Sequence, residues 1–242
     1  MAETIKIFSS NILEDGTVTV TGEDSAYPAT RLHDRSRNLY WRYSATGALT
    51  FHVDQGATGN VGVDAMAIIG HNFDGEDMQW QYSDNDSDWY DAVTDWTQSG
   101  NADIVKTLGS PATHRYWRVT VSSMTNPLCG EIWMSEGYSF DIARKPDPFH
   151  SYRDNVRWSE SIGGQVRSIK FGESGSEWSY SLRLSSLTDI DSIVSDLDGF
   201  SLPFFFKDKD SNYSMGRFFP LPAKDFFDNT YSQVDVHIIE ML

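Results

Sequence analysis

Residues 114–121 read His-Arg-Tyr-Trp-Arg-Val-Thr-Val, in which Trp117, Val119 and Val121 alternate with polar residues. Successive side chains of a strand point to opposite faces, so this period of two predicts a strand with one buried and one solvated face. The same pattern recurs in short runs separated by Gly, Asn, Asp and Ser: Val18 and Val20; Leu49, Phe51 and Val53; Met78, Trp80 and Tyr82. Such runs predict a mainly β protein of the antiparallel sandwich or barrel type.

The composition excludes several classes of partner. The 242 residues include 35 Asp and Glu against 19 Lys and Arg, a formal charge of −16, so we expect no nucleic-acid partner. The longest apolar stretch, Ala65–Ile69, is far shorter than the roughly 20 residues that cross a bilayer, so we expect no membrane insertion. Residues 1–11 lack the features of a signal peptide, and Cys129 is the one cysteine, so we expect residence inside a cell or a particle assembled there.

A proline-containing segment divides the chain. Pro146 and Pro148 disfavour a regular ladder, because proline has no backbone N–H to donate. We therefore predict a first domain over residues 1–140, a linker over 141–156 and a β-rich second domain over 157–242. Residues 1–140 carry 8 basic and 19 acidic side chains, and residues 141–242 carry 11 and 16, so the acidity belongs mainly to the first domain.

The second domain mixes two periodicities. Apolar residues at helical spacing predict a helix over 187–198, with Asp189 and Asp191 in its first turn and Gly199 after its end. Strand-like runs surround it: Gln165–Phe171, Glu177–Leu184, Leu202–Lys207, Tyr213–Phe219 and Gln233–Glu240. The predicted order is therefore β-β-α-β-β-β.

Few residues form a pattern that indicates chemistry. Asp84, Asp86 and Asp88 have a spacing that could bring carboxylates together on calcium, but Trp89 stands where an EF-hand loop needs glycine. A solvated acidic hairpin turn is the alternative, and the sequence leaves calcium binding open. No nucleophile elbow, phosphate-binding loop or local metal motif is present, so we predict no catalytic, metal or cofactor site and no enzyme.

Aromatic residues next to predicted loops are the other candidates. Trp89, Tyr90 and Trp96 could stack on a sugar ring, because an aromatic face offers a flat apolar platform. The alternative is that they fill the core or an interface, and for Trp89 we favour that alternative.

An ordered set of motifs in the first domain resembles the discoidin family, the galactose-binding-like jelly roll. The motifs, which span residues 32–140, are NLYWRYSATG around Trp41, LTFHVDQG at 49–56, VDAMAIIGHN at 63–72, QWQYSDNDSDWYDAV at 79–93, HRYWRVTV at 114–121 and GEIWMSEGYSF at 130–140. The resemblance implies an antiparallel jelly-roll sandwich. It also implies that residues 84–89 form a hairpin turn followed by a structural tryptophan.

The second domain adds a looser resemblance. Its motifs are GGQVRSIKFGE at 163–173, WSYSLRLSSLTDIDSIVSDLDG at 178–199 and FFFKDKD at 204–210. Following a discoidin-like domain, they resemble structural proteins of tailed bacteriophages, especially of the tail tip or baseplate. This resemblance implies a non-enzymatic virion protein that is assembled in the host cytoplasm. Its partners would be other tail proteins, further copies of itself in a symmetric ring, and host surface glycans.

A phenylalanine-rich group would supply the ring interface. Its members are Phe204, Phe205, Phe206, Phe218, Phe219, Phe226 and Phe227. Phe204 and Phe206 share one strand face, so Phe205 points the other way and is the better interface candidate. A carbohydrate-binding module or lectin-like protein is the alternative function, and an enzyme whose site one sequence does not reveal is a third.

Overall fold

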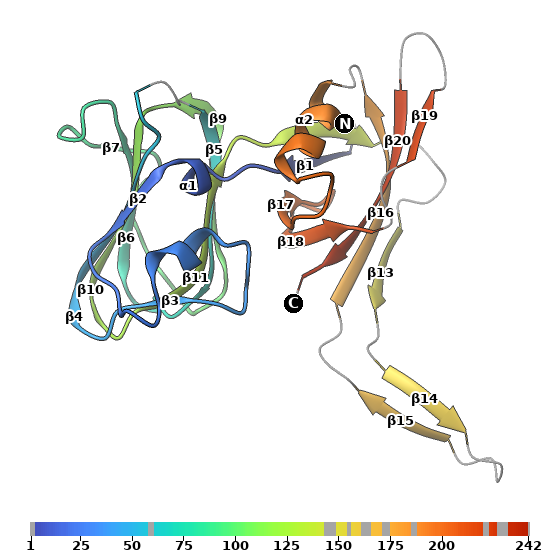
Figure 1. Cartoon of the computed structure of the whole chain (residues 1–242), viewed down its shortest axis with the longest axis horizontal. Helices are drawn as coiled ribbons and strands as arrows, with labels where there is room; N and C mark the ends of the chain where they lie inside the picture. Colours follow the sequence, from blue (N-terminus) through green and yellow to red (C-terminus); the bar gives the residue numbers. More distant parts are fainter. Residues whose placement is uncertain are drawn as a thin grey trace. The chain divides into compact units, whose positions relative to one another are not determined.

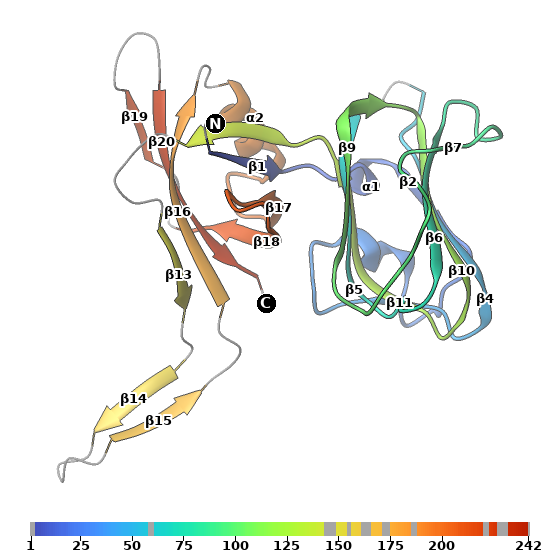
Figure 2. The same cartoon turned by 180° about the vertical axis from the view of Figure 1, so that it is seen from behind.

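The computed structural model describes residues 3–57, 61–142, 149–153, 156–160, 166–170, 175–184, 188–219, 223–226 and 232–241. The chain divides into two compact units (Figures 1 and 2). The first unit is Phe8–Gly137, and the second unit joins Met1–Ile7 to Tyr138–Leu242. Within the described residues no helix is both long enough and apolar enough to span a membrane.

The first unit is an antiparallel β-sandwich. One sheet has the order β2-β4-β10-β6-β7, with β8 also on β6, and the other has the order β3-β11-β5-β9. Figure 1 shows the strands of these two sheets as facing layers. The elements are α1 (Ile12–Asp15), β2 (Thr17–Val20), η1 (Ala29–His33), β3 (Trp41–Arg42), β4 (Thr46–Asp54), β5 (Gly62–His71), β6 (Asp77–Ser83), β7 (Tyr90–Asp91), β8 (Trp96–Thr97), β9 (Ile104–Thr113), β10 (Tyr116–Thr125) and β11 (Leu128–Ser135).

The alternation in the sequence is confirmed in the β2-β4-β10-β6-β7 sheet, whereas β5 and β11 of the other sheet are buried on both faces. Every second residue of β4, β6 and β10 enters one hydrophobic cluster between the layers, while the residues between them face outward. Trp41, Trp80 and Trp117 are fully buried in this cluster. The rings of Trp80 and Trp117 lie 5.5 Å apart. Burial of these large rings is the main stabilising contribution to the sandwich.

The second unit contains a closed ring of strand pairings. β16 (Gly175–Leu184), β12 (Tyr138–Ile142), β1 (Thr4–Phe8), β17 (Phe204–Lys207), β18 (Tyr213–Phe218) and β20 (Ser232–Glu240) pair in that order, and β20 pairs again with β16. β13 (Phe149–Arg153) adds to β16, and β19 (Ala223–Phe226) adds to β20. β14 (Val156–Glu160) and β15 (Val166–Lys170) form a separate hairpin. Closure leaves the six ring strands with few open edges.

The units differ from the predicted domains at three points. The first domain was predicted to end at residue 140, but the second unit resumes at Tyr138, where β12 begins. β1 lies in the first domain by sequence, but it pairs with β12, with Ile5 opposite Phe140, and so belongs to the second unit. β13 falls within the segment predicted to be a linker, but it pairs with β16. Both strands are joined to their sheets by pairings between segments distant in sequence, which local patterns do not specify.

The predicted helix is confirmed as α2 (Thr188–Asp196), and Ile190 and Ile193 are buried on its inner face. Gly199 follows it with φ of +70° and donates its N–H to the carbonyl of Val194, as a glycine C-cap does. The prediction that Phe205 is an exposed interface residue is wrong. Phe205 is 2% exposed and stacks on Tyr213 with 5.6 Å between the rings.

The phenylalanine group as a whole is mostly internal. Phe204 and Phe206 are fully buried, and Phe218 joins the same core cluster. Phe219 is the exception in the described part of the group, because 65% of its surface is exposed. The side chain of Phe226 and all of Phe227 lie outside the described residues. β17 places apolar side chains on both of its faces, so the period-two rule did not identify an outward phenylalanine.

A buried acid in the first unit has an unusual environment. Glu131 of β11 is fully buried, and its Oε2 accepts a hydrogen bond from the backbone N–H of Arg35 at 3.1 Å. Its Oε1 has no hydrogen-bond partner among the described residues. Burial, together with the nearby carboxylates of Asp34 and Glu14, raises the pKa of Glu131 well above 4.5.

We expect the Glu131→Gln variant to be more stable than the native chain at pH 7.5. The pKa of Glu131 is higher in the folded state than in the unfolded state. The native chain therefore has its full stability below about pH 4.5 and loses part of it as the pH rises through the folded-state pKa. Glutamine does not titrate, so the variant avoids this loss. The expected gain is about 1–3 kcal/mol, the range for a buried polar group with an unmet bond. Urea unfolding followed by tryptophan fluorescence at pH 4.5 and pH 7.5 measures it.

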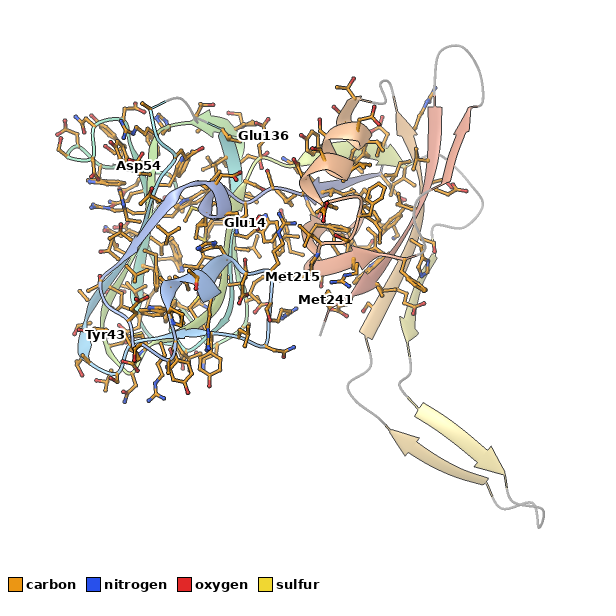
Figure 3. All side chains as sticks on the ribbon, in the orientation of Figure 1. Glu14, Tyr43, Asp54, Glu136, Met215 and Met241 are labelled. Atoms are coloured by element: carbon orange, nitrogen blue, oxygen red, sulfur yellow. The ribbon has the colours of Figure 1, made fainter. Side chains whose placement is uncertain are left out.

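The control is Glu136→Gln. Glu136 is exposed and directly follows β11, the strand that contains Glu131 (Figure 3). That variant should leave the difference in unfolding free energy between the two pH values unchanged. An equal pH dependence in Glu131→Gln and the native chain would contradict a raised pKa of Glu131 in the fold.

Candidate functional site

The outer face of the β2-β4-β10-β6-β7 sheet presents rows of polar side chains. Strand register places one row across the sheet: Thr19, His52, Arg118, Gln81 and Asp91. Two residues along the strands, a second row consists of Thr50, Thr120 and Gln79. The residues between the rows point into the core, so both rows face away from it.

Hydrogen bonds fix the amide side chains of these rows. Arg118 donates from Nε to Gln81 Oε1 at 2.8 Å, and Gln81 donates from Nε2 to Asp91 Oδ1 at 2.7 Å. In the second row Gln79 donates from Nε2 to Asp95 Oδ2 at 2.8 Å. Arg118 donates to the Gln81 amide, and no carboxylate lies within ion-pair distance of it in the described part of the chain.

The turn between β6 and β7 lies over the first row. The Arg118 guanidinium carbon is 3.9 Å from the centre of the Trp89 ring, and His52 meets the same ring edge-on at 5.7 Å. Asp86 Oδ1 lies 3.1 Å from His52 Nε2, at ion-pair distance but without hydrogen-bond geometry. The turn and strands β2, β4 and β10 line a hollow of about 330 Å³ that is open to solvent. We call it the Trp89 hollow.

Trp89 does not fill the core, so that half of the favoured alternative is wrong, and the other half, a place in an interface, stays a prediction. Trp89 is half-buried, lies outside the hydrophobic cluster and contacts outward-facing residues. The hairpin turn implied at residues 84–89 is confirmed, because β6 and β7 pair with Tyr82 opposite Tyr90. Asp86 has a φ of +59°, which an aspartate adopts more readily than most residues, at the bend of this turn.

A second hollow follows the second row. It has a volume of about 660 Å³ and crosses β4, β10, β6 and β8, with Thr50, Thr120 and Gln79 on its floor and Trp96 at one side. We call it the Trp96 hollow. Lys106 Nζ lies 4.2 Å from the centre of the Trp96 ring, and burial lowers the pKa of Lys106. Thr50 lines both hollows, so they adjoin, and we call the two together the trough.

The three aspartates of the possible calcium loop have different partners. Asp84 pairs with His114 at 3.0 Å, Asp86 faces His52, and Asp88 Oδ2 accepts from the side-chain amide of Asn85. Among the described residues no group of three or more His, Cys, Asp or Glu side chains is arranged to hold a metal ion. Each of the three carboxylates therefore has a different protein partner.

Tyr90, the third aromatic candidate, lies outside the trough. It is 58% exposed and stacks on Tyr82 at 5.9 Å, and Tyr82 in turn stacks on His114 at 3.9 Å. At the same end of the sheet, two hydrogen bonds from Arg115 lower the pKa of Asp54 to about 2. Figure 3 shows Asp54 and Tyr43 toward opposite ends of the sandwich.

The sequence indicated two of the trough aromatics but not its polar residues. Trp89 and Trp96 were candidates, whereas His52, Arg118 and Gln79 were not. The signal that could have found them was the set of polar residues that alternate with apolar ones in each strand, since those polar residues must share the outer face of the sheet. It was insufficient alone, because a solvated face of any sheet has the same composition.

The comparisons with known proteins give distant structural similarity. No protein-family model matches the chain, and no curated protein matches it. A Ruminococcus gnavus GH29 fucosidase solved with fucose is 18% identical, with TM-score 0.46, over 55% of this chain and 28% of the fucosidase. The family 32 carbohydrate-binding module of Clostridium perfringens NanJ, solved with galactose, is 18% identical, with TM-score 0.43, over 54% of this chain and 98% of the module.

A third solved structure is CpGH89CBM32-6 from Clostridium perfringens. It is 21% identical, with TM-score 0.43, over 53% of this chain and all of that protein. The chain therefore spans less than a third of the length of the fucosidase, but nearly the full length of the isolated modules. At these TM-scores the likeness assigns neither a function nor binding residues to this chain.

Proposed function

We propose that the first unit is a non-catalytic carbohydrate-binding domain and that the trough is its binding surface. The observation that carries the proposal is the Trp89 hollow. There an aromatic ring, a guanidinium without a carboxylate partner and the Asp86 carboxylate border one open space. This corresponds to the alternative function indicated by the sequence.

The chemistry of a sugar matches these groups. A sugar has C–H faces, which pack on aromatic rings, and a ring of hydroxyls, each of which donates and accepts hydrogen bonds. Arg118 supplies donors, and Asp86 supplies acceptors. Charged partners make the stronger hydrogen bonds, so one donor and one acceptor of this kind would orient a hydroxyl-bearing ligand.

We expect the Trp89→Ala variant to bind polysaccharide at least about 10-fold more weakly than the native chain, a difference of about 1.4 kcal/mol. The substitution removes the aromatic surface of the hollow and the support of the Arg118 guanidinium. Isothermal titration of the full chain against soluble galactan and β-glucan, chosen after a polysaccharide screen, measures the change.

The matched control is Tyr40→Ala. Tyr40 is 37% exposed, stacks on Tyr27 at 5.3 Å and belongs to the same unit but lines neither hollow. It should bind as the native chain does. Loss of binding in Tyr40→Ala with retention in Trp89→Ala would place the site elsewhere, and absence of binding to every polysaccharide screened would contradict the proposed function.

Assembly of the second unit is a second candidate function. The supporting observation is the hairpin β14–β15, which pairs with no other strand among the described residues. A two-stranded hairpin is marginally stable alone in water, so a neighbouring chain would stabilise it. In this proposal the second unit forms a symmetric ring in the tail of a bacteriophage particle assembled in the host cytoplasm, and other tail proteins are its partners. Light scattering with negative-stain imaging tests it, and a monomer at high concentration would contradict it.

A further inference from the structure

We infer that the trough binds the interior of an extended, uncharged glycan chain through two subsites, one in each hollow. The inference rests on the proposed function and adds the form and the charge of the ligand. It follows from three features of the trough, which are its continuity, its flat hydroxyl-bearing floor and the sign of its charges.

The two hollows form one path across the strands. Both are lined by Thr50, with Trp89 beside the first and Trp96 beside the second. The Trp96 hollow alone crosses β4, β10, β6 and β8. Neighbouring strands are about 4.8 Å apart, so three spacings make this part about 14 Å long. That length exceeds one sugar ring, and it places the two tryptophans at separate positions along a chain.

The floor between the tryptophans suits a continuous chain. Thr50 and Thr120 lie side by side in the register of β4 and β10, and both have short side chains. Thr120 donates from Oγ1 to Gln79 Oε1 at 3.2 Å, and Asp95 fixes the other end of that amide. Thr50, which lines both hollows, has a short side chain, and a ligand that crosses it would contact both.

The charges of the trough disfavour an acidic chain. The Trp89 hollow contains Arg118 and Asp86, with His52 beside the carboxylate, while the Trp96 hollow contains Asp77 and Asp95 and no cationic lining residue. Three carboxylates therefore line the path with one guanidinium, and Lys106, which contacts the Trp96 ring, is not among the lining residues. The whole chain has a formal charge of −16, which repels a polyanion at longer range.

The test is a length series. Oligosaccharides of one to six units, cut from the neutral polysaccharide that binds the native chain best, are titrated calorimetrically. Two linked subsites raise affinity without new contact chemistry, so we expect at least about a 10-fold gain from the single unit to the longest chain, followed by a plateau. Equal affinity for all lengths would overturn the inference while leaving the proposed function intact.

A bulky substitution at the residue shared by the two hollows tests whether one ligand occupies both subsites. We expect Thr50→Trp to abolish most of the length-dependent gain, because the new ring fills the shared point of the hollows. The matched control is Thr17→Trp, at an exposed position on the same sheet that lines neither hollow. If Thr50→Trp binds the longest chain as tightly as the native protein does, the two-subsite inference is wrong.

Asp95→Ala is a second variant, at an exposed residue, in case the tryptophan disturbs the fold. It releases Gln79 in the Trp96 hollow, so it should reduce the affinity for long chains toward that of a single unit. Polygalacturonate is the acidic probe, and binding tighter than that of the neutral polymer would overturn the charge assignment. Failure of the native chain to bind any polymer would instead contradict the proposed function itself.

Discussion

Replacing Trp117 with alanine is expected to lower the free energy of unfolding of the first unit by about 3–5 kcal/mol, the usual range for a buried tryptophan truncated to alanine. Trp117 is fully buried, its ring lies 5.5 Å from that of Trp80, and its Nε1 donates to the carbonyl of His114 at 3.1 Å. The variant loses this packing and hydrogen bond and leaves a cavity between the two sheets.

The same residue connects the core to the trough. Tyr116 and Arg118 flank Trp117 in β10, and Arg118 faces the Trp89 hollow. Urea unfolding measured alongside polysaccharide binding distinguishes the two roles, since Trp89→Ala should reduce binding but lower stability by less than about 1 kcal/mol. A loss below 1 kcal/mol in Trp117→Ala would show that the sandwich core relaxes around the missing ring.

Replacing Arg35 with alanine is the second large effect, an expected loss of about 3 kcal/mol. Arg35 is 7% exposed and makes two hydrogen bonds to the Glu14 carboxylate, from Nε at 2.6 Å and from Nη2 at 2.8 Å. Its Nη2 also donates to the Ser9 carbonyl, and its guanidinium lies 5.1 Å from the centre of the Trp133 ring. Arg35 is the buried member of this pair and Glu14 is partly exposed, so the substitution removes buried packing and leaves the Glu14 carboxylate without its counter-charge.

The effect of this substitution extends to the backbone. Arg35 has a φ of +57°, which a side-chain-bearing residue adopts at some energetic expense, so the contacts of its side chain hold the loop after η1 in place. Arg37→Ala in the same loop is the control. Its partner is Asp103, and both side chains are at least one-quarter exposed, so we expect a loss of no more than about 1 kcal/mol.

Thermal or urea unfolding of the two arginine variants, each beside the native chain, makes the comparison. Equal losses in Arg35→Ala and Arg37→Ala would show that burial of the Arg35 pair has no particular effect. An unchanged midpoint in Arg35→Ala would contradict its role in joining the loop to α1 and Ser9.

The local elements were predictable because their patterns lie within short windows. Strands such as β4 and β10 bury every second residue, and α2 buries Ile190 and Ile193 at helical spacing, so the hydrophobic effect acts on neighbours in the sequence. The prediction for Phe205 failed for a local reason. Phe205 is in a strand buried on both faces, where alternation carries no information about direction.

The amino-acid sequence by itself determined that this chain is mainly β, that one helix interrupts its second half, and that its polar surface is acidic. Only the tertiary structure decided that β1 joins the second unit and that Trp89 covers the outer face of a sheet beside Arg118 and His52. The physical reason is that alternation fixes which face a side chain occupies. Strand pairing between distant segments fixes which side chains meet on that face, and here those meetings form the trough.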